Sequence, residues 1–161
     1  MLIREVRAED AAEWLRMRHA LWSDATPDEH RREIESYFDE TRPRPSTIQV
    51  AFVAARDDGT LCGFLEAGVR PYADGCETPN VGYLEGWYID ADVRRQGIGA
   101  LLVRAAEDWA RWRGCREMAS DCELDNEISL AAHTRLNYEE VERAIHFRKT
   151  LLTDATGNSD D

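Results

Sequence analysis

The segment from Val81 to Trp112 constrains the possible folds more than any other part of the chain. Its first part, Val81 to Ile89, is rich in aromatic and apolar residues and predicts a strand. A turn with two glycines follows, and apolar residues then recur at helical spacing at Ile98, Leu101, Leu102, Ala105 and Trp109. One apolar stripe on a helix that directly follows a strand predicts a helix packed on a sheet.

The turn itself, Arg94-Arg95-Gln96-Gly97-Ile98-Gly99, suits an anionic ligand. Glycines let the backbone approach a ligand closely, and the first N–H groups of a helix have no partner within the helix. The turn lacks the third glycine of the dinucleotide-binding pattern and the Gly-Lys-Ser/Thr of a phosphate-binding loop. Glycines at a helix start also serve as plain turn or packing residues, so the turn alone leaves its role open.

The rest of the chain predicts a mixed sheet with helices on its faces. A hairpin around Asp57-Asp58-Gly59 precedes the segment described above, and strand–helix alternation follows it. Thr26 and Glu29 form the pattern of a capping box at the start of the second helix. We expect helices over 8–22, 27–38, 98–112 and 125–136, and strands over 48–55, 61–70, 81–89, 115–121 and 141–151.

The length of 161 residues and the hydrophobic content of 43% fit one compact domain. We expect this domain to span residues 1–152. The remaining residues, 153–161, are small, polar and acidic, and they predict a flexible tail.

The net charge of −12, from 32 acidic and 20 basic residues, excludes nucleic acid as a partner and favours a cationic ligand. The alternative is that the acidity serves solubility alone. No apolar run is long enough to span a membrane and no signal-peptide core follows Met1, so we expect a cytoplasmic protein without a membrane partner. The four cysteines have no metal-ligand spacing, so we expect free thiols and no metal.

With its flanking strand and helix, the turn resembles the Arg/Gln-x-x-Gly-x-Gly/Ala signature of the GNAT superfamily of N-acetyltransferases, with Arg94, Gly97 and Gly99 at the signature positions. The resemblance implies an α/β fold with a mixed, mostly antiparallel sheet, and acetyl-CoA as the co-substrate. It implies that the amides of the turn hold the pyrophosphate. The implied cofactor contacts are Trp87, Tyr88, Ile89, Arg94, Arg95, Gln96, Gly97, Ile98, Gly99 and Asn126, of which Asn126 could instead be a helix cap.

Several further blocks resemble the bacterial aminoglycoside 6'-N-acetyltransferases, in the same order along the chain. These are Leu21-Trp22, Tyr72-Ala73-Asp74-Gly75, Tyr83-Leu84-Glu85-Gly86, Met118-Ala119-Ser120-Asp121, Asp125-Asn126-Glu127-Ile128-Ser129 and Glu140-Val141-Glu142-Arg143. The likeness runs from Trp14 to Lys149. It implies acetylation of the 6'-amine of a cationic antibiotic, hence resistance, and a homodimer.

Three acids are candidates for contact with the substrate amine. Strand alternation places Glu85 among aromatic residues, on the same face as Tyr83 and Trp87. Its alternative role is to pair with a buried arginine such as Arg70. Glu66 has the same mid-strand setting, and Asp121 ends a strand, where it could instead cap a helix. The resemblance favours substrate contact for Glu85 and Asp121, and for the aromatic walls Trp22 and Tyr72 as well. Glu66 is a candidate substrate contact from its setting in the strand, with a weaker claim.

The chemistry of amine acetylation explains why carboxylates are expected at the site. An ammonium group must lose a proton before it attacks a thioester, and a carboxylate both attracts the cation and accepts the proton. Attack on bound acetyl-CoA is then direct, with backbone N–H groups near residues 85–89 stabilising the oxyanion. Many superfamily members carry a tyrosine as the acid for the leaving thiolate, but this chain has His133 at that position. His133 could do the same work or could be structural.

Two other functions stay open on sequence alone. The acceptor could be a polyamine, a metabolite amine or a protein amine, since an acidic cleft suits each of them. The chain could also be a sensor that binds acyl-CoA without turnover.

Overall fold

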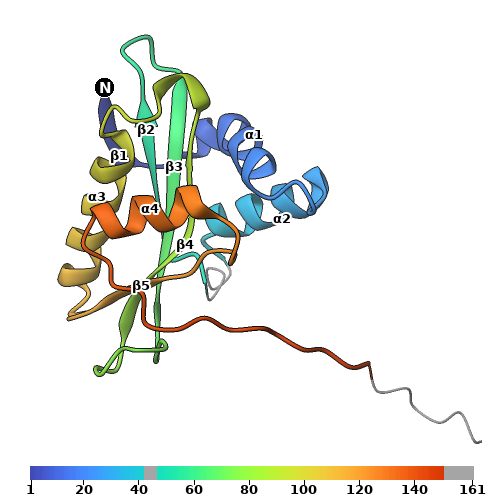
Figure 1. The fold of residues 1–161 in the computed structure, drawn as a ribbon. Helices are drawn as coiled ribbons and strands as arrows, with labels where there is room; N and C mark the ends of the chain where they lie inside the picture. Colours follow the sequence, from blue (N-terminus) through green and yellow to red (C-terminus); the bar gives the residue numbers. More distant parts are fainter. Residues whose placement is uncertain (42–46, 151–161) are drawn as a thin grey trace, which may run out of the picture.

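The computed structural model describes residues 1–41 and 47–150 and contains one five-stranded sheet in the order β1-β2-β3-β4-β5 (Figure 1). The first four strands pair antiparallel, whereas β4 and β5 are parallel. The expected mixed, mostly antiparallel sheet is therefore confirmed. The strands are β1 Leu2–Glu5, β2 Val50–Ala55, β3 Leu61–Arg70, β4 Val81–Ile89 and β5 Met118–Ser120.

Helices cover both faces of the sheet (Figure 1). Trp14 and Met17 of α1 pack with Ile34 of α2 on one face, and Leu102 and Ala106 of α3 pack on the other. The expected capping box of α2 is present, because Thr26 and Glu29 bond each other's backbone N–H groups. The helices are α1 Ala11–Leu21, α2 Pro27–Phe38, α3 Ile98–Trp112 and α4 Glu127–Arg135, with short 3₁₀ turns η1 Ala8–Asp10 and η2 Ala91–Val93.

A β-bulge changes which way β4 presents its side chains. Glu66 pairs with Gly86 and Ala67 pairs with Leu84, so Glu85 is an extra residue on β4. Trp87 consequently packs on the α3 side, against the start of that helix. The expectation that Glu85 and Trp87 share one face was wrong, because simple alternation ignores the inserted residue.

The strand predicted over 141–151 is not formed in its described part, 141–150. The chain after α4 runs as an irregular extended segment that passes the body of the protein and then leaves it (Figure 1). Ile145 and Phe147 are 74% and 92% exposed. Alternating apolar residues form a strand only where a neighbouring strand offers hydrogen bonds, and no strand within residues 1–41 and 47–150 pairs with this segment. Strand β1 was not predicted, and the expected tail 153–161 lies outside the described residues.

A charged cluster is buried between α1 and the sheet. The Glu66 side chain is 1% exposed, accepts a hydrogen bond from Trp14 Nε1 at 2.8 Å, and lies 3.4 Å from Arg18 Nε. Arg18 also pairs with Glu33 and lies against the rings of Trp14 and Trp22. Burial raises the pKa of Glu66 from 4.5 to about 7, against the opposing effects of Arg18 and Trp14.

We predict that Glu66→Gln becomes more stable relative to the wild type as pH rises. Between about pH 4.5 and 7 the unfolded carboxyl loses its proton while the folded one keeps it, so the wild type loses stability over this window. Urea unfolding of both proteins at about pH 5 and 7.5 measures this effect. Between the two pH values, the unfolding free energy of the variant should rise relative to that of the wild type by on the order of 2 kcal/mol. A difference that does not change with pH would contradict the raised pKa.

Candidate active site

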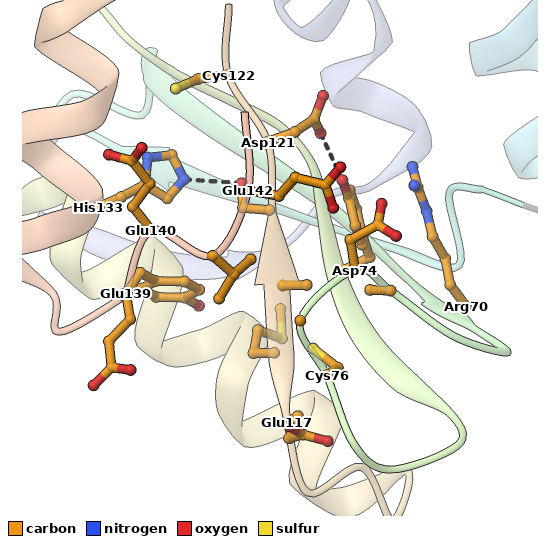
Figure 2. A pocket seen from close by; sticks show the side chains of 18 of the residues that line it. Arg70, Asp74, Cys76, Glu117, Asp121, Cys122, His133, Glu139, Glu140 and Glu142 are labelled. Carbon is orange, nitrogen blue, oxygen red and sulfur yellow. Dashed lines mark hydrogen bonds between the residues drawn. The ribbon is translucent and has the colours of Figure 1, made fainter. Parts of the chain in front are cut away.

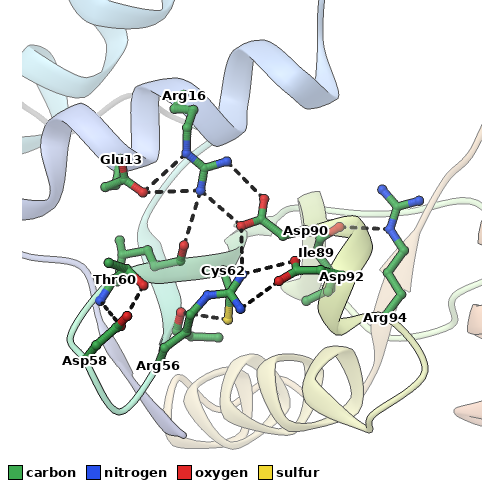
Figure 3. A network of polar contacts seen from close by, with 12 residues as sticks. Glu13, Arg16, Arg56, Asp58, Thr60, Cys62, Ile89, Asp90, Asp92 and Arg94 are labelled. Atoms are coloured by element: carbon green, nitrogen blue, oxygen red, sulfur yellow. Dashed lines mark hydrogen bonds and ion pairs between the residues drawn. The ribbon is translucent and has the colours of Figure 1, made fainter.

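The glycine turn is held in place by two arginine–aspartate pairs (Figure 3). Arg16 of α1 donates to both oxygens of Asp90, at 3.0 and 3.2 Å. Arg56, just after β2, donates to both oxygens of Asp92, at 2.8 and 3.1 Å. These pairs tie the entrance of the turn to two other elements, so its shape does not depend on a ligand.

Within the turn, both glycines are required by the geometry. Gly97 caps α3 with φ +82°, a conformation that other residues adopt with strain. At Gly99 a Cβ atom would come within 2.6 Å of the Trp87 ring. Ile98 is buried, whereas Arg94, Arg95 and Gln96 are exposed around the free N–H groups of the first helical turn. Exposed amides beside two cations suit a pyrophosphate.

Strands β4 and β5 separate beside this turn. They pair only from Gly82–Met118 to Leu84–Ser120, so β4 continues to Ile89 without a β5 partner. Here the indole N–H of Trp87 is buried and has no hydrogen-bond partner among the described residues. An unpaired buried donor is costly unless a ligand supplies an acceptor. The free edge at Trp87, Tyr88 and Ile89 therefore fits the arm of a bound acyl-CoA.

A pocket of about 950 Å³ lies between the loop after β3, the end of β5, α4 and the segment after it (Figure 2). Tyr72, 73% exposed, lies on its wall. Four arginines line the pocket, Arg70, Arg111, Arg116 and Arg143, against eight acids, Asp74, Glu107, Glu117, Asp121, Glu123, Glu139, Glu140 and Glu142. Its lining therefore favours a cationic ligand.

Asp121 lies in this pocket with one oxygen engaged. Tyr83 Oη donates to Asp121 Oδ1 at 2.8 Å. Burial, together with this hydrogen bond, raises the pKa of Tyr83 well above its usual value, so the phenol stays a donor. Figure 2 shows Asp121, Glu142 and Asp74 directed toward one region of the pocket. The second oxygen of Asp121 is available to a ligand there.

Glu85 is engaged on both oxygens by Arg70. Arg70 Nε donates to Oε1 at 2.9 Å and Nη2 to Oε2 at 2.6 Å. The guanidinium also lies 3.4 Å from the ring centre of Tyr83. The arginine pairing weighed for Glu85 is thus what the structure shows.

His133 contacts Ser120 at the point where the two strands separate. Its Nδ1 lies 2.8 Å from the carbonyl oxygen of Ser129, which only accepts, so Nδ1 carries the proton of the neutral ring. Nε2, 2.8 Å from Ser120 Oγ, then accepts from the serine hydroxyl. The ring also makes edge contacts with Trp87 and Tyr138.

The remaining candidates lie outside the pocket lining. Asn126 caps α4 by accepting from Ser129 N at 3.0 Å, the alternative weighed for it. Trp22 covers Gly86, next to Glu85, and Glu66 is buried behind it. Sequence reasoning gave no role to Ser120, Asp74 or Glu142, although all three stand in the motif blocks.

Residues 1–41 and 47–150 contain no group of three or more His, Cys, Asp or Glu side chains placed to hold a metal. Among these residues, no helix is both long and apolar enough to cross a bilayer. The four cysteines are free thiols, two of them buried.

Solved structures of two acetyltransferases share this fold. The apo aminoglycoside antibiotic 6'-N-acetyltransferase AAC(6')-IG from Acinetobacter haemolyticus has a TM-score of 0.83 at 35% identity, covering 94% of this chain and 99% of that one. AAC(6')-Iy, in complex with the bisubstrate analogue CoA-S-monomethyl-acetylneamine, has a TM-score of 0.83 at 32% identity, covering 93% and 98%.

Relatives found by sequence carry the same enzyme name as these structures. Aminoglycoside N(6')-acetyltransferase type 1 of Klebsiella aerogenes is 45% identical over 150 residues, which is 93% of this chain and 97% of that protein. The protein of the same name from Serratia marcescens is 38% identical over 139 residues, 86% and 91% of the two chains. The model of the acetyltransferase (GNAT) family matches residues 14–138. The glycine turn, the separated strands and these matches together show that the chain belongs to the acetyltransferase (GNAT) family.

Proposed function

We propose that this protein transfers the acetyl group of acetyl-CoA to the 6'-amine of aminoglycosides. The observation that carries the proposal is the acidic pocket that holds Asp121 beside the gap between β4 and β5. The names of the relatives, and the CoA-derived bisubstrate analogue in the AAC(6')-Iy complex, support the same reaction.

Acetyl-CoA would be held by the glycine turn and the free edge of β4. The amides at Gly97, Ile98 and Gly99 receive the pyrophosphate, flanked by the exposed Arg94, Arg95 and Gln96. Trp87 offers its unpaired indole N–H, and the backbone N–H groups near Tyr88 and Ile89 face the place where the oxyanion forms. Asn126, at the start of α4, is the proposed contact for the pantetheine arm.

Asp121 is the proposed base and amine ligand. Its free oxygen attracts the 6'-ammonium group and accepts the proton that this group must lose before attack. The neutral amine then attacks the thioester carbonyl directly. The C–N bond forms, the nitrogen gives its second proton to solvent, and the C–S bond breaks to leave the amide and the CoA thiolate. Glu85 is the second candidate carboxylate for the amine, although Arg70 engages both of its oxygens in the free protein. Tyr72 offers an aromatic wall to a sugar ring.

His133 supplies a proton to the leaving sulfur through Ser120. Since Nε2 of His133 faces Ser120 Oγ, it does not reach the sulfur directly. In the imidazolium form, Nε2–H donates to Ser120 Oγ while the serine hydroxyl gives its own proton to the thiolate. The result is CoA thiol, the amide and neutral His133, which regains its proton from solvent.

We further propose that the protein acts in the cytoplasm, confers aminoglycoside resistance and is a homodimer. The cytoplasmic location is supported by the proposed co-substrate, because acetyl-CoA is a cytoplasmic metabolite. The homodimer is supported by the segment after α4. This segment exposes Val141, Ile145 and Phe147, and a large exposed apolar surface is typical of an interaction site.

We predict that purified protein releases thiol from acetyl-CoA with kanamycin or tobramycin, but not with an analogue that lacks the 6'-amine. The physical reason is that only the 6'-amine reaches both Asp121 and the thioester. Expression in a susceptible bacterium should raise the inhibitory concentration of the same drugs. Turnover with spermidine alone would move the acceptor to polyamines, and CoA binding without any turnover would indicate a sensor.

Asp121→Asn is the matched variant for this assay. It keeps the hydrogen bond from Tyr83 within reach but removes the charge and the base, so we expect kcat/KM to fall by about 10²-fold or more. Unchanged activity would remove Asp121 from the proposed mechanism.

We predict that Ser120→Ala and His133→Gln each lower kcat by about tenfold or more while changing the KM for acetyl-CoA little. Thermal unfolding of both variants serves as the control for folding. An unchanged kcat in either variant would remove the relay through Ser120 from the proposed mechanism.

We predict a mass of about twice 18.4 kDa by gel filtration with light scattering. Phe147→Glu, which places a charge on the exposed segment, should shift the equilibrium toward the monomer. A wild-type mass near that of one chain would overturn the dimer.

A further inference from the structure

Arg70, the last residue of β3, lies at the edge of the acidic pocket and is paired with the carboxylate proposed to attract the substrate. It donates to both oxygens of Glu85 and covers the ring of Tyr83 at 3.4 Å. Glu85 lies next to the pocket but is 11% exposed, whereas the Arg70 side chain is 40% exposed. Water and ligands therefore reach the guanidinium rather than the carboxylate.

This arrangement leaves Glu85 without a free oxygen. Two charge-assisted hydrogen bonds satisfy the carboxylate, and the positive charge of Arg70 cancels its charge as seen from the pocket. A substrate ammonium group that is to bind Glu85 must first take the place of the guanidinium. Asp121 differs, because Tyr83 engages only one of its oxygens.

We propose that Arg70 is a specificity-determining residue that occupies, in the free protein, the place of a substrate ammonium group at Glu85. The inference rests on the proposed function, since the displacing group is an amine of the aminoglycoside. Binding exchanges one cation for another, so the buried carboxylate is never left unpaired, which would be costly. The Tyr83 ring, uncovered by the same movement, then offers its face to the incoming cation.

The position of Arg70 allows this exchange. It ends β3 immediately before the loop that starts at Pro71, and its exposed part faces the pocket, so the side chain can move into solvent without unfolding a strand. Selectivity follows from competition. A monoamine gains too little elsewhere in the pocket to displace a bidentate arginine, whereas a polycation bound also by Asp121, Asp74 or Glu142 gains more.

A different role for Arg70 predicts the opposite effect of its removal on substrate affinity. If Arg70 stays in place and holds Glu85 in position, the substrate binds to Asp121 and the other acids, and loss of Arg70 weakens binding. Removal of the side chain therefore distinguishes the two.

The experiment measures the binding of tobramycin to the acetyl-CoA-free protein by calorimetry at low salt, for wild type, Arg70→Met, Arg70→Lys and Arg116→Met. Arg116 is a matched control, because it lines the same pocket and, within the described residues, pairs with no carboxylate. Arg116→Met thus removes the same charge without releasing an acid. CoA binding and thermal unfolding check that each variant is folded.

We expect Arg70→Met to bind tobramycin roughly three- to tenfold more tightly, as loss of a competing, partly exposed ion pair implies. Arg116→Met should change the affinity less than about twofold, and Arg70→Lys should stay near the wild type. In a Glu85→Gln background, Arg70→Met should have no larger effect than Arg116→Met, because the released carboxylate is the source of the gain.

Weaker or unchanged binding by Arg70→Met, with wild-type affinity restored in Arg70→Lys, would overturn the inference while wild-type turnover left the proposed function intact. A wild-type protein that neither binds nor acetylates aminoglycosides would overturn the proposed function and the inference with it.

Discussion

The short pairing between β4 and β5 is the constraint on which the site depends. Three residue pairs hold the two strands together, and past Leu84 and Ser120 they part. Because backbone groups at a free edge need partners, the gap is a place where an extended acyl chain can bind like a strand. The glycine turn lies at one side of this gap and the acidic pocket at the other, so in the proposed reaction cofactor and acceptor meet where the pairing ends.

The bulge at Glu85 has a complementary effect. By inserting one residue, it places Trp87 toward α3 and the glycine turn, while Glu85 stays with Tyr83 and Arg70. In the proposed function, one side of β4 therefore contacts the cofactor and the other side contacts the acceptor. Gly99 and Trp87 are in contact, so the anion-binding turn and the reacting edge of β4 are fixed relative to each other.

The sequence predicted most of the fold, because helical and strand periodicities report local burial. It also predicted the glycine turn, since φ +82° at Gly97 and the lack of space at Gly99 both require glycine. The bulge was not predictable, because it depends on how β3 and β4 are aligned. Burial of Glu66 depends on long-range contacts with Trp14 and Arg18 that have no local signal. The pairing of Glu85 with Arg70 was one of two roles that the sequence left open, and only the contact between β3 and β4 decides between them. The strand expected near the end of the chain had the right pattern, but a pattern does not supply a neighbouring strand.

The segment after α4 illustrates how the site is divided along the chain. Val141 packs against Gly75, so residues near the end of the described chain and the loop after β3 together form the wall of the pocket, whereas the cofactor turn comes from residues 90–99. The two halves meet at β4 and at the contact between Trp87 and His133. Under the proposed function, substitutions in the loop and the final segment are expected to change which amines are accepted while leaving the cofactor turn intact.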